Sequence, residues 1–507
     1  MQQVLILDFG SQYTQLIARR IREQNVYCEV RTCFEKCTWK PDALILSGGP
    51  ASVLGDDAPE FDTSWLELDI PILGICYGMQ LLAHFYGGQV RTSTHREYGQ
   101  ALIHPTKNEG LFHDVDASTE VWMSHGDDVV EPPPKWEVLA KSDDGVIAAI
   151  ADPENRCFGL QFHPEVTHTV LGAKMLRNFL FTISNLDGSW SMGSFVEKKV
   201  AELREELPEG NVLCAMSGGV DSSVTATLLH KAIGSRLHCV FVDNGLMRKG
   251  EKEEIAKEFV DLPLTIVDAS KRFLDALSGV TDPEKKRKII GHTFIDVFDD
   301  VVQQLEEEKG AFVYLAQGTL YPDIIESVSV RGPAATIKSH HNVGGLPEKM
   351  KLKLVEPLKE LFKDEVRGVG RELGMSSWRI DRQPFPGPGM AVRILGGVDA
   401  QKVSVVQDAD RIFDEEIRAA GLYKSLWQSF AVLLPVKSVG VMGDSRSYEW
   451  TVVLRAVHSE DGMTAKVARL PWEVLERTST RIINEVARVN RVAFDVSNKP
   501  PSTIEWE

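Results

Sequence analysis

Short apolar runs alternate with segments of helical periodicity over residues 1–183. Residues 4–10 (VLILDFG) have the pattern of a buried strand that ends in glycine, and residues 12–25 place apolar side chains three and four positions apart, as one face of a helix requires. Further strand patterns lie at 42–50, 70–76 and 157–165, and further helical patterns lie at 77–87 and 170–181. This alternation predicts an open α/β domain with a mostly parallel sheet, which carries its active site at the carboxyl ends of the strands.

A second α/β pattern follows residues 184–194, which are rich in Ser, Gly and Asn and which we interpret as a linker. A helical pattern at 195–207 precedes the strand pattern NVLCAM at 211–216, and the alternation continues to a helical pattern at 363–373. The pattern predicts a second open, parallel-sheet α/β domain of the Rossmann-like kind.

A third domain is predicted after residues 381–390, where three prolines and two glycines within six residues exclude a regular helix. Beyond them, a helical pattern at 405–421 and a strand pattern at 448–457 indicate a small α+β domain. The predicted domain boundaries are therefore 1–183, 190–382 and 383–507.

The composition narrows the class of protein. An apolar content of 43% and a charged content of 25% are ordinary for a globular protein, and the formal net charge of −17 disfavours a nucleic-acid partner, which binds to a surplus of Lys and Arg. The sequence has neither a run of about 18 apolar residues nor a signal-peptide pattern, so we expect a cytoplasmic protein with no membrane partner. Seven cysteines at irregular spacing predict reduced thiols rather than disulfides or a zinc site.

A candidate nucleophile lies where a strand pattern meets a helical one. Cys76 stands between Gly74 and Gly78, and G-x-C-x-G has the logic of the nucleophile elbow, in which a tight turn presents the reactive side chain. A helix that begins just after the cysteine favours the thiolate, which is the attacking species. A lone cysteine is more often a core thiol, so the assignment needs a base nearby.

The stretch GLQFHPE, residues 159–165, supplies a base and an acid. His163 and Glu165 are two positions apart at the end of a strand pattern, so their side chains share one face. An imidazole can take and return the thiol proton, and a carboxylate can orient that imidazole. The backbone N–H groups of Gly48 and Gly49, after another strand pattern, are candidates for an oxyanion hole.

Residues 1–183 resemble the class I glutamine amidotransferases on the motifs G-x-C-x-G and H-P-E. The resemblance implies that Cys76, His163 and Glu165 form a catalytic triad that releases ammonia from glutamine. It also implies an oxyanion hole formed by the backbone amides of Gly49 and Tyr77. The glutamine-binding residues that it implies are Gln80, Ser124, His125, Gly126 and Asp127.

The stretch CAMSGGVDSS, residues 214–223, carries a strand pattern through two glycines into a helix, and such a junction aims backbone N–H groups at an anion. It lacks the lysine of the kinase-type phosphate loop. It resembles instead the PP-loop of the N-type ATP pyrophosphatases, which implies that pyrophosphate leaves and an adenylate remains. The residues implied to bind ATP are Ser217, Gly218, Gly219, Val220, Asp221, Ser222 and Ser223.

The same resemblance assigns a cation and a metal ion. Lys363, in the motif LFKDEVR, is expected to lie over the phosphates as a lid, and Asp364 and Glu365 are candidates for metal binding or for ordering the helix start. Taken alone, this Lys-Asp-Glu set is more typical of the solvated first turn of a helix, where acids are favoured by the helix dipole. Mg²⁺ is expected to accompany ATP, with Asp221 as its nearest ligand.

The whole chain resembles the glutamine-hydrolysing GMP synthase family, on motifs that include QGTLYPDIIES, IKSHHNVGG, PFPGPG and KPPSTIEWE. The family implies the amination of XMP through an adenyl-XMP intermediate, with ATP and glutamine as the other substrates. We expect Arg287, Lys499 and Glu505 to contact XMP, and the C-terminal domain to form a homodimer as it does in this family. The apolar and proline content of the tail 499–507 predicts that it is docked, since free termini are normally polar.

Two other functions are compatible with the same folds. A glutamine or nucleotide sensor would bind without turnover, but it would be free to lose Cys76, His163, Glu165 and Asp221, which are all present. A tRNA-modifying enzyme would also use a PP-loop, but the net charge of −17 disfavours that partner. Product analysis and tRNA binding at physiological salt distinguish the three.

Overall fold

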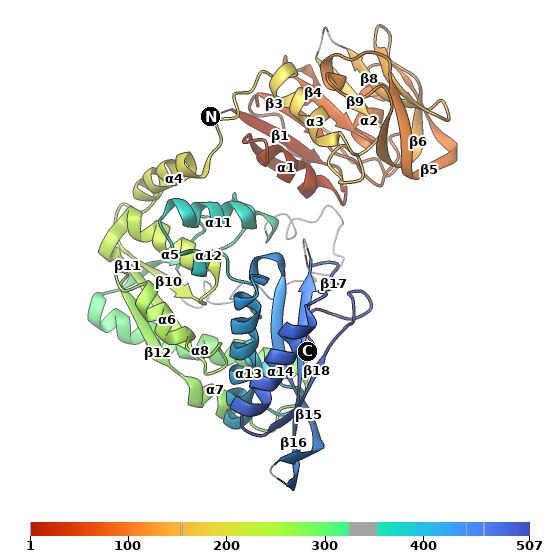
Figure 1. Ribbon diagram of the computed structural model, residues 1–507. Coiled ribbons are helices and arrows are strands. Elements are labelled where there is room, and N and C mark those ends of the chain that lie inside the picture. Colours follow the sequence, from red (N-terminus) through yellow and green to blue (C-terminus); the bar gives the residue numbers. More distant parts are fainter. Residues whose placement is uncertain (1, 153, 155, 324–351, 443, 460–461) are drawn as a thin grey trace. The chain divides into compact units, whose positions relative to one another are not determined.

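The computed structural model describes residues 2–323 and 352–507, except residues 153, 155, 443 and 460–461 (Figure 1). The motif IKSHHNVGG and the end of QGTLYPDIIES lie outside the described residues. The chain divides into two compact units, one formed by Met1–Phe195 with Leu320–Ile337 and the other by Val196–Thr319 with Lys338–Glu507. Among the described residues, no helix is long and apolar enough to cross a membrane.

The first unit is built on a nine-stranded sheet in the order β2-β1-β3-β4-β9-β8-β7-β5-β6. The first five of these strands are parallel, as predicted, and the four inner ones are mainly buried apolar runs because a parallel sheet is covered on both faces, whereas the edge strand β2 is only partly buried. They are β2 (Tyr27–Thr32), β1 (Gln3–Asp8), β3 (Ala43–Leu46), β4 (Ile72–Ile75) and β9 (Cys157–Leu160). The main helices are α1 (Thr14–Arg22), α2 (Tyr77–Phe85) and α3 (Gly172–Arg177), which continues into η3 (Asn178–Ile183).

The other four strands extend this sheet in antiparallel fashion and are absent from the sequence prediction. They are β8 (Ile147–Asp152), β7 (Glu137–Ser142), β5 (Gln89–Pro105) and β6 (Thr119–Glu131). Along the first half of β6, buried side chains alternate with less buried ones, which is the period of a sheet with one face toward water. Such a segment lacks the continuous apolar run by which the parallel strands were predicted.

The second unit is entered through helix α4 (Met192–Glu206), and its first sheet is parallel throughout, in the order β12-β11-β10-β13-β14. The strands are β10 (Asn211–Met216), β11 (Leu237–Asp243), β12 (Leu264–Asp268), β13 (Phe312–Ala316) and β14 (Lys353–Val355). The helices are α5 (Val220–Ile233), α6 (Glu251–Glu258), α7 (Ser270–Ala276), α8 (Pro283–Lys309), α11 (Lys363–Glu372) and α12 (Ser377–Ile380). This part has the predicted Rossmann-like alternation.

The C-terminal part has the predicted α+β composition. A long hairpin of β15 (Gln428–Met442) and β16 (Ser445–His458) is joined by β17 (Lys466–Val467) and by β18 (Val489–Phe494), which pairs parallel with β16. Its two helices are α13 (Ala400–Ala419) and α14 (Trp472–Glu485).

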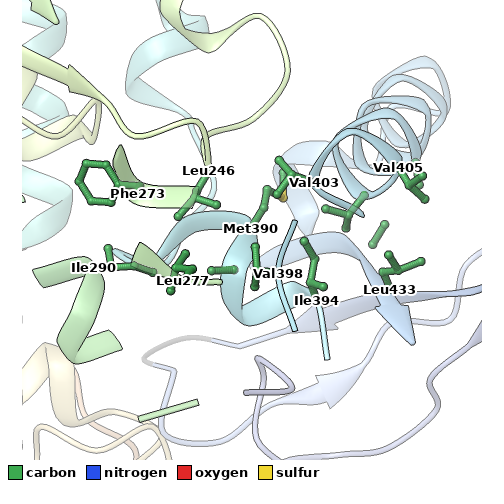
Figure 2. Close-up of a cluster of buried hydrophobic side chains, with 14 of the residues drawn as sticks. Leu246, Phe273, Leu277, Ile290, Met390, Ile394, Val398, Val403, Val405 and Leu433 are labelled. Carbon is green, nitrogen blue, oxygen red and sulfur yellow. The ribbon is translucent and has the colours of Figure 1, made fainter. Parts of the chain in front are cut away.

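One hydrophobic cluster joins the two sheets of the second unit (Figure 2). It contains Leu246 and Phe273 from the parallel-sheet part, and Met390, Ile394 and Leu433 from the C-terminal part. The predicted boundary between residues 382 and 383 therefore lies inside a single compact unit with a shared core.

Candidate active sites

Cys76 lies at the junction of β4 and α2, with a backbone φ of +49°. This conformation is strained for a residue with a side chain, and it is held by the Cys76 N–H, which donates to the carbonyl oxygen of Leu160 at 2.7 Å. The flanking glycines allow the turn, because a Cβ at Gly74 would lie 2.4 Å from the carbonyl carbon of Gly78, and a Cβ at Gly78 would lie 2.4 Å from the carbonyl oxygen of Leu46. The tight turn predicted from G-x-C-x-G is present.

Cys76, His163 and Glu165 form a continuous set of contacts. The Sγ of Cys76 lies 3.2 Å from Nε2 of His163, and Nδ1 of His163 lies 2.7 Å from Oε1 of Glu165. All three side chains are buried. Burial by itself lowers the pKa of His163, but the adjacent Cys76 and Glu165 groups outweigh burial and raise that pKa to about 11. An imidazolium in contact with the sulfur favours the thiolate, which is the nucleophilic form.

Three residues that the sequence analysis missed hold the base and the acid in place. The hydroxyl of Thr169 donates to the carbonyl oxygen of His163 at 2.6 Å, and the guanidinium of Arg20 donates to the carbonyl oxygen of Glu165 at 3.0 Å. The ring of Tyr13 meets the His163 ring edge-on, with the centroids 4.8 Å apart. Tyr13 and Arg20 belong to α1 and its N-cap, far from His163 in the sequence, and none of the three residues belongs to a motif, so only the folded chain identifies them.

The predicted glutamine-binding residues 124–127 lie on β6, in the antiparallel part of the sheet. They are brought to the triad because the N–H of His163 donates to the carbonyl oxygen of Trp122 at 3.0 Å. Gln80 comes from α2, and its side-chain amide donates to the carbonyl oxygen of Asp127 at 2.8 Å. The antiparallel extension therefore places these residues beside the nucleophile.

The two predicted oxyanion-hole segments flank the pair of Cys76 and His163. Gly48 and Gly49 follow β3, and a Cβ at Gly48 would lie 3.3 Å from Cε1 of the His163 ring. Tyr77 is the first residue of α2, where the backbone N–H has no partner within the helix.

The loop of residues 217–219 connects β10 to α5 and is ordered by Ser217 and by Ser222 of α5. The N–H of Ser217 donates to the hydroxyl oxygen of Ser222 at 3.2 Å, and the N–H of Gly219 donates to the hydroxyl oxygen of Ser217 at 3.3 Å. The side chains of Val220 and Ser223 are buried, so any contact of these two residues with a ligand at the loop would come from the backbone.

Lys363 meets the loop from a helix far along the chain. Its Nζ lies 2.5 Å from both carboxylate oxygens of Asp221. Lys363 begins α11, which approaches α5 so closely that a Cβ at Gly370 would lie 3.2 Å from the Val224 side chain. The carboxylate of Glu365 accepts from the N–H of Phe362 at 2.9 Å, so it orders the helix start, which is one of the two roles expected for it.

The donor set at the loop fits a metal ion that arrives with a nucleotide. Among the residues that the structure describes, no three His, Cys, Asp or Glu side chains are grouped to bind a metal ion. Mg²⁺ in nucleotide sites is commonly bound by one or two carboxylates together with phosphate oxygens and water. Asp221 can supply one such carboxylate.

The candidate XMP residues of the tail already have partners within the protein. The carboxylate of Glu505 accepts from the buried guanidinium of Arg393 at 3.1 Å and from the side-chain amide of Gln428 at 2.6 Å. Burial lowers the pKa of Arg393, but Glu505 and Asp410 outweigh burial and raise it. The Nζ of Lys499 donates to the carbonyl oxygen of Gly462 at 2.8 Å.

The tail itself is docked, which confirms that prediction. Ile504 and Trp506 pack on a buried cluster of the β15–β16 sheet. The fully buried guanidinium of Arg455 donates to the carbonyl oxygens of Thr503 at 2.9 Å and of Ile504 at 2.8 Å.

Four consecutive cations, residues 285–288, lie at the start of α8, and among them the structure distinguishes Lys286 from Arg287. Arg287 is partly exposed and pairs with Glu284 at 2.5 Å. Lys286 is fully buried, and its Nζ contacts the carboxylate of Glu507, the last residue of the chain, and the carbonyl oxygen of Ala391. Charge patterning does not reveal which cation turns inward, so a specific role in this run was predicted for Arg287 alone.

Three family models match parts of the chain. The model of glutamine amidotransferase class-I matches residues 5–183, the model of the tRNA methyl transferase HUP domain matches residues 210–273, and the model of the GMP synthase C terminal domain matches residues 415–506. The first match contains the whole thiol–imidazole–carboxylate set, and the second contains the loop after β10. The chain is therefore a class I glutamine amidotransferase joined to a HUP-type nucleotide domain.

Curated relatives extend the match to the full chain. Proteins named glutamine-hydrolyzing GMP synthase are 55% identical in Oleidesulfovibrio alaskensis and 57% identical in Solidesulfovibrio magneticus, with 99% of each chain covered. The protein of that name in Phenylobacterium zucineum is 54% identical over 100% of this chain and 99% of its own. The chain belongs to the glutamine-hydrolysing GMP synthase family, whose members are ATP-dependent ligases.

Proposed function

We propose that the chain aminates XMP to GMP with ammonia from glutamine, and that it releases AMP, pyrophosphate and glutamate. The observation that carries the proposal is the presence of two sites in one chain of this family. One is the set of contacts from Cys76 through His163 to Glu165, and the other is the lysine-free loop at which Asp221 meets Lys363. Ammonia released at the first site is useful only where an activated acceptor is made.

At the first site, the thiolate of Cys76 attacks the side-chain amide carbon of glutamine. His163 gives its proton to the departing ammonia, and the resulting thioester is then hydrolysed by a water molecule whose proton His163 accepts. Glu165 keeps the imidazole oriented through Nδ1. The backbone amides of Gly49 and Tyr77 stabilise the oxyanion of both steps. Gln80 and residues 124–127 bind the glutamine.

At the second site, the loop from Ser217 to Ser223 binds the β- and γ-phosphates of ATP as one leaving group. The C2 oxygen of XMP attacks the α-phosphate, the bond between the α- and β-phosphates breaks, and pyrophosphate leaves. Mg²⁺, when bound beside Asp221, supplies positive charge for that leaving group. Lys363 then meets the phosphates as a second cation. Ammonia adds at C2 of the adenylated XMP, and AMP departs.

Arg287, Lys499 and Glu505 are the residues that we assign to XMP. Lys499 and Glu505 support a binding surface at the docked tail, because their hydrogen bonds with Gly462 and Arg393 hold a cation and a carboxylate there. A phosphate needs the cation, and a ring or ribose donor needs the carboxylate.

A homodimer formed through the C-terminal sheet is part of the proposal. Val436, Val439, Val441 and Tyr448 are 58% to 76% exposed on the β15–β16 hairpin, and Val439 lies opposite Tyr448 in the strand register. An exposed apolar face of this kind is typical of a surface that a second copy covers. A cytoplasmic location agrees with the seven free cysteines.

The test is the Cys76→Ala variant, assayed with glutamine and with ammonium. We expect it to lose glutamine-dependent GMP formation and to retain ammonia-dependent formation within about tenfold of the wild type, a difference of ~1.4 kcal/mol in the barrier. His163→Ala is expected to behave in the same way, because it serves the same sulfur. Failure of ammonium to rescue either variant, or release of ADP and phosphate in place of AMP and pyrophosphate, contradicts the proposal.

A further inference from the structure

Two buried arginines converge on one carbonyl oxygen of the loop after β10. Nη1 of Arg379, on α12, and Nη1 of Arg382, just beyond it, each donate to the carbonyl oxygen of Gly218 at 2.8 Å. The side chain of Arg379 is fully buried and that of Arg382 is 7% exposed. Neither residue belongs to the loop or to any motif that the proposed function uses.

The contacts fix the direction of one peptide group. In a trans peptide the C=O and N–H bonds point in opposite directions, so a Gly218 carbonyl turned inward to the guanidinium groups turns the Gly219 N–H outward. In agreement with this direction, the Gly219 N–H meets the hydroxyl oxygen of Ser217, a residue on the exposed side of the loop. That is the side on which an anion can approach.

The backbone at this position is conformationally demanding. Gly218 has a φ of +76°, in the left-handed region that favours glycine. A Cβ there would lie 2.9 Å from the carboxylate of Glu251 and 3.0 Å from the side chain of Ile255, both on α6. The loop therefore lies directly against α6, and the peptide has little room to reach another orientation.

The arginines are held rigidly behind the loop. Arg382 pairs with the buried carboxylate of Glu251 at 2.5 Å. The guanidinium of Arg379 lies 4.7 Å from the centre of the Trp378 ring, and its Nε and Nη2 atoms are buried with no hydrogen-bond partner among the described residues. Burial, and after it the neighbouring Arg382, lower the pKa of Arg379 to about 10. Two buried guanidinium groups at one oxygen are costly for the fold, which indicates a role besides stability.

We propose that Arg379 and Arg382 are positioning residues that hold the 218–219 peptide with its N–H toward the β,γ-pyrophosphate group of ATP. The inference rests on the proposed function, because it takes the loop to be the pyrophosphate site. Preorganised backbone donors stabilise developing negative charge without reorienting when the charge appears. A peptide free to rotate would present its carbonyl oxygen to the phosphates for part of the time and would repel them.

The test compares inhibition by pyrophosphate with inhibition by AMP, in ammonia-dependent GMP formation by the full chain. For Arg379→Gln and Arg382→Gln we expect the Ki of magnesium pyrophosphate and the KM for ATP to rise together by about tenfold, which corresponds to ~1.4 kcal/mol. We expect the Ki of AMP and the KM for XMP to stay within about twofold, because neither ligand carries the β- and γ-phosphates. Arg379→Lys and Arg382→Lys keep a charged donor and are expected to lie between the glutamine variants and the wild type.

Arg22→Gln is the matched control. Arg22 is also a buried arginine that donates to a backbone carbonyl oxygen, that of Cys28 at 2.7 Å, but it belongs to the first unit. It should leave the Ki of pyrophosphate unchanged. If the glutamine variants do not fold, as judged by circular dichroism and glutamine hydrolysis, the lysine variants provide the same comparison.

Two outcomes overturn the inference while the proposed function stands. In one, the wild type releases AMP and pyrophosphate but the variants bind pyrophosphate as tightly as the wild type does. In the other, the Ki values of pyrophosphate and AMP rise equally, which indicates general damage to the site. A wild type that produces neither AMP nor pyrophosphate contradicts the proposed function itself.

Discussion

The buried ion pair between Lys286 and Glu507 predicts that the side chain of Glu507 controls the affinity for XMP. The Nζ of Lys286 has three oxygen acceptors, which are the carboxylate of Glu507 and the carbonyl oxygens of Ala391 at 3.1 Å and Ile394 at 2.7 Å. The Glu507 carboxylate also accepts from the N–H of Gly396 at 3.2 Å. Glu507→Gln keeps the shape of the side chain and removes its charge.

The free-energy cost of Glu507→Gln follows from the burial of the ion pair. Removing one partner of a buried ion pair costs about 3–5 kcal/mol, and we expect the lower end here, ~3 kcal/mol, because Lys286 keeps both carbonyl acceptors. That free energy corresponds to a change of about 100-fold in the ratio of docked to undocked tail. Because Lys499 and Glu505 are assigned to XMP, the apparent KM for XMP rises as the docked fraction falls, whereas the KM for glutamine does not change.

The defect should depend on pH in a defined direction. Burial lowers the pKa of Lys286, although the ion pair with Glu507 opposes that shift. A lysine whose pKa is lower in the docked state than in the undocked state binds fewer protons when docked, so docking becomes more favourable as pH rises. Glu507→Gln removes the opposing charge and lowers the pKa of Lys286 further. We therefore expect the KM defect of Glu507→Gln to shrink between about pH 7 and pH 9.

The assay is an XMP titration of ammonia-dependent GMP formation, together with backbone hydrogen exchange of residues 502–507. The double variant Lys286→Met/Glu507→Gln removes both charges and is expected to be less impaired than Glu507→Gln alone. Asp300 lies on α8, as Lys286 does, and Asp300→Asn is the control, since it breaks an exposed ion pair with Arg272 of α7, worth about 0–1 kcal/mol. The expected role of Glu507 is refuted if Glu507→Gln has the hydrogen exchange and the KM for XMP of the wild type, or if the double variant has a higher KM for XMP than Glu507→Gln.

Glu165→Gln is expected to slow glutamine hydrolysis about 100-fold, less than the loss of the nucleophile does. It removes one of the groups that raise the pKa of His163, so the alkaline decline of the rate should begin at a lower pH than in the wild type; glutaminase rates from about pH 6 to pH 10 check this. Gly78→Ala is expected to destabilise the first unit by about 1–3 kcal/mol, since the new Cβ would lie 2.4 Å from a carbonyl oxygen, and thermal unfolding measures the loss. Lys363→Ala and Asp221→Ala are each expected to abolish release of AMP and pyrophosphate while glutamine hydrolysis continues; continued pyrophosphate release would contradict their roles.

The contacts among Cys76, His163 and Glu165 were predictable because their determinants are local. Cys76 lies at a strand–helix junction marked by two glycines, and His163 and Glu165 lie two positions apart at a strand end, so short patterns specify the turn and the shared face. The contact between the two segments follows from parallel pairing of β4 with β9, which brings the ends of these strands together.

What the sequence did not reveal depends on tertiary contacts. The first half of the antiparallel strand β6 carries the alternation of a half-exposed sheet, which resembles a polar surface segment when the sequence is read linearly. The four consecutive cations at the start of α8 are chemically alike, and only packing shows that Lys286 turns inward while Arg287 stays partly exposed. Ser223 illustrates the same point, since the motif implies that it binds ATP but does not reveal that its side chain is buried.

The missing lysine of the phosphate loop has a structural consequence. A lysine within the loop would be held near the phosphates by local backbone alone, whereas Lys363 reaches Asp221 only while α11 packs on α5. In the structure its ammonium is neutralised by the Asp221 carboxylate. A magnesium ion that takes this carboxylate as a ligand would free the ammonium for the phosphates, because one carboxylate cannot fully neutralise both cations. Under the proposed function, the cation would become available when the nucleotide and its metal ion are both present, which would suit a site that releases pyrophosphate only from a bound substrate.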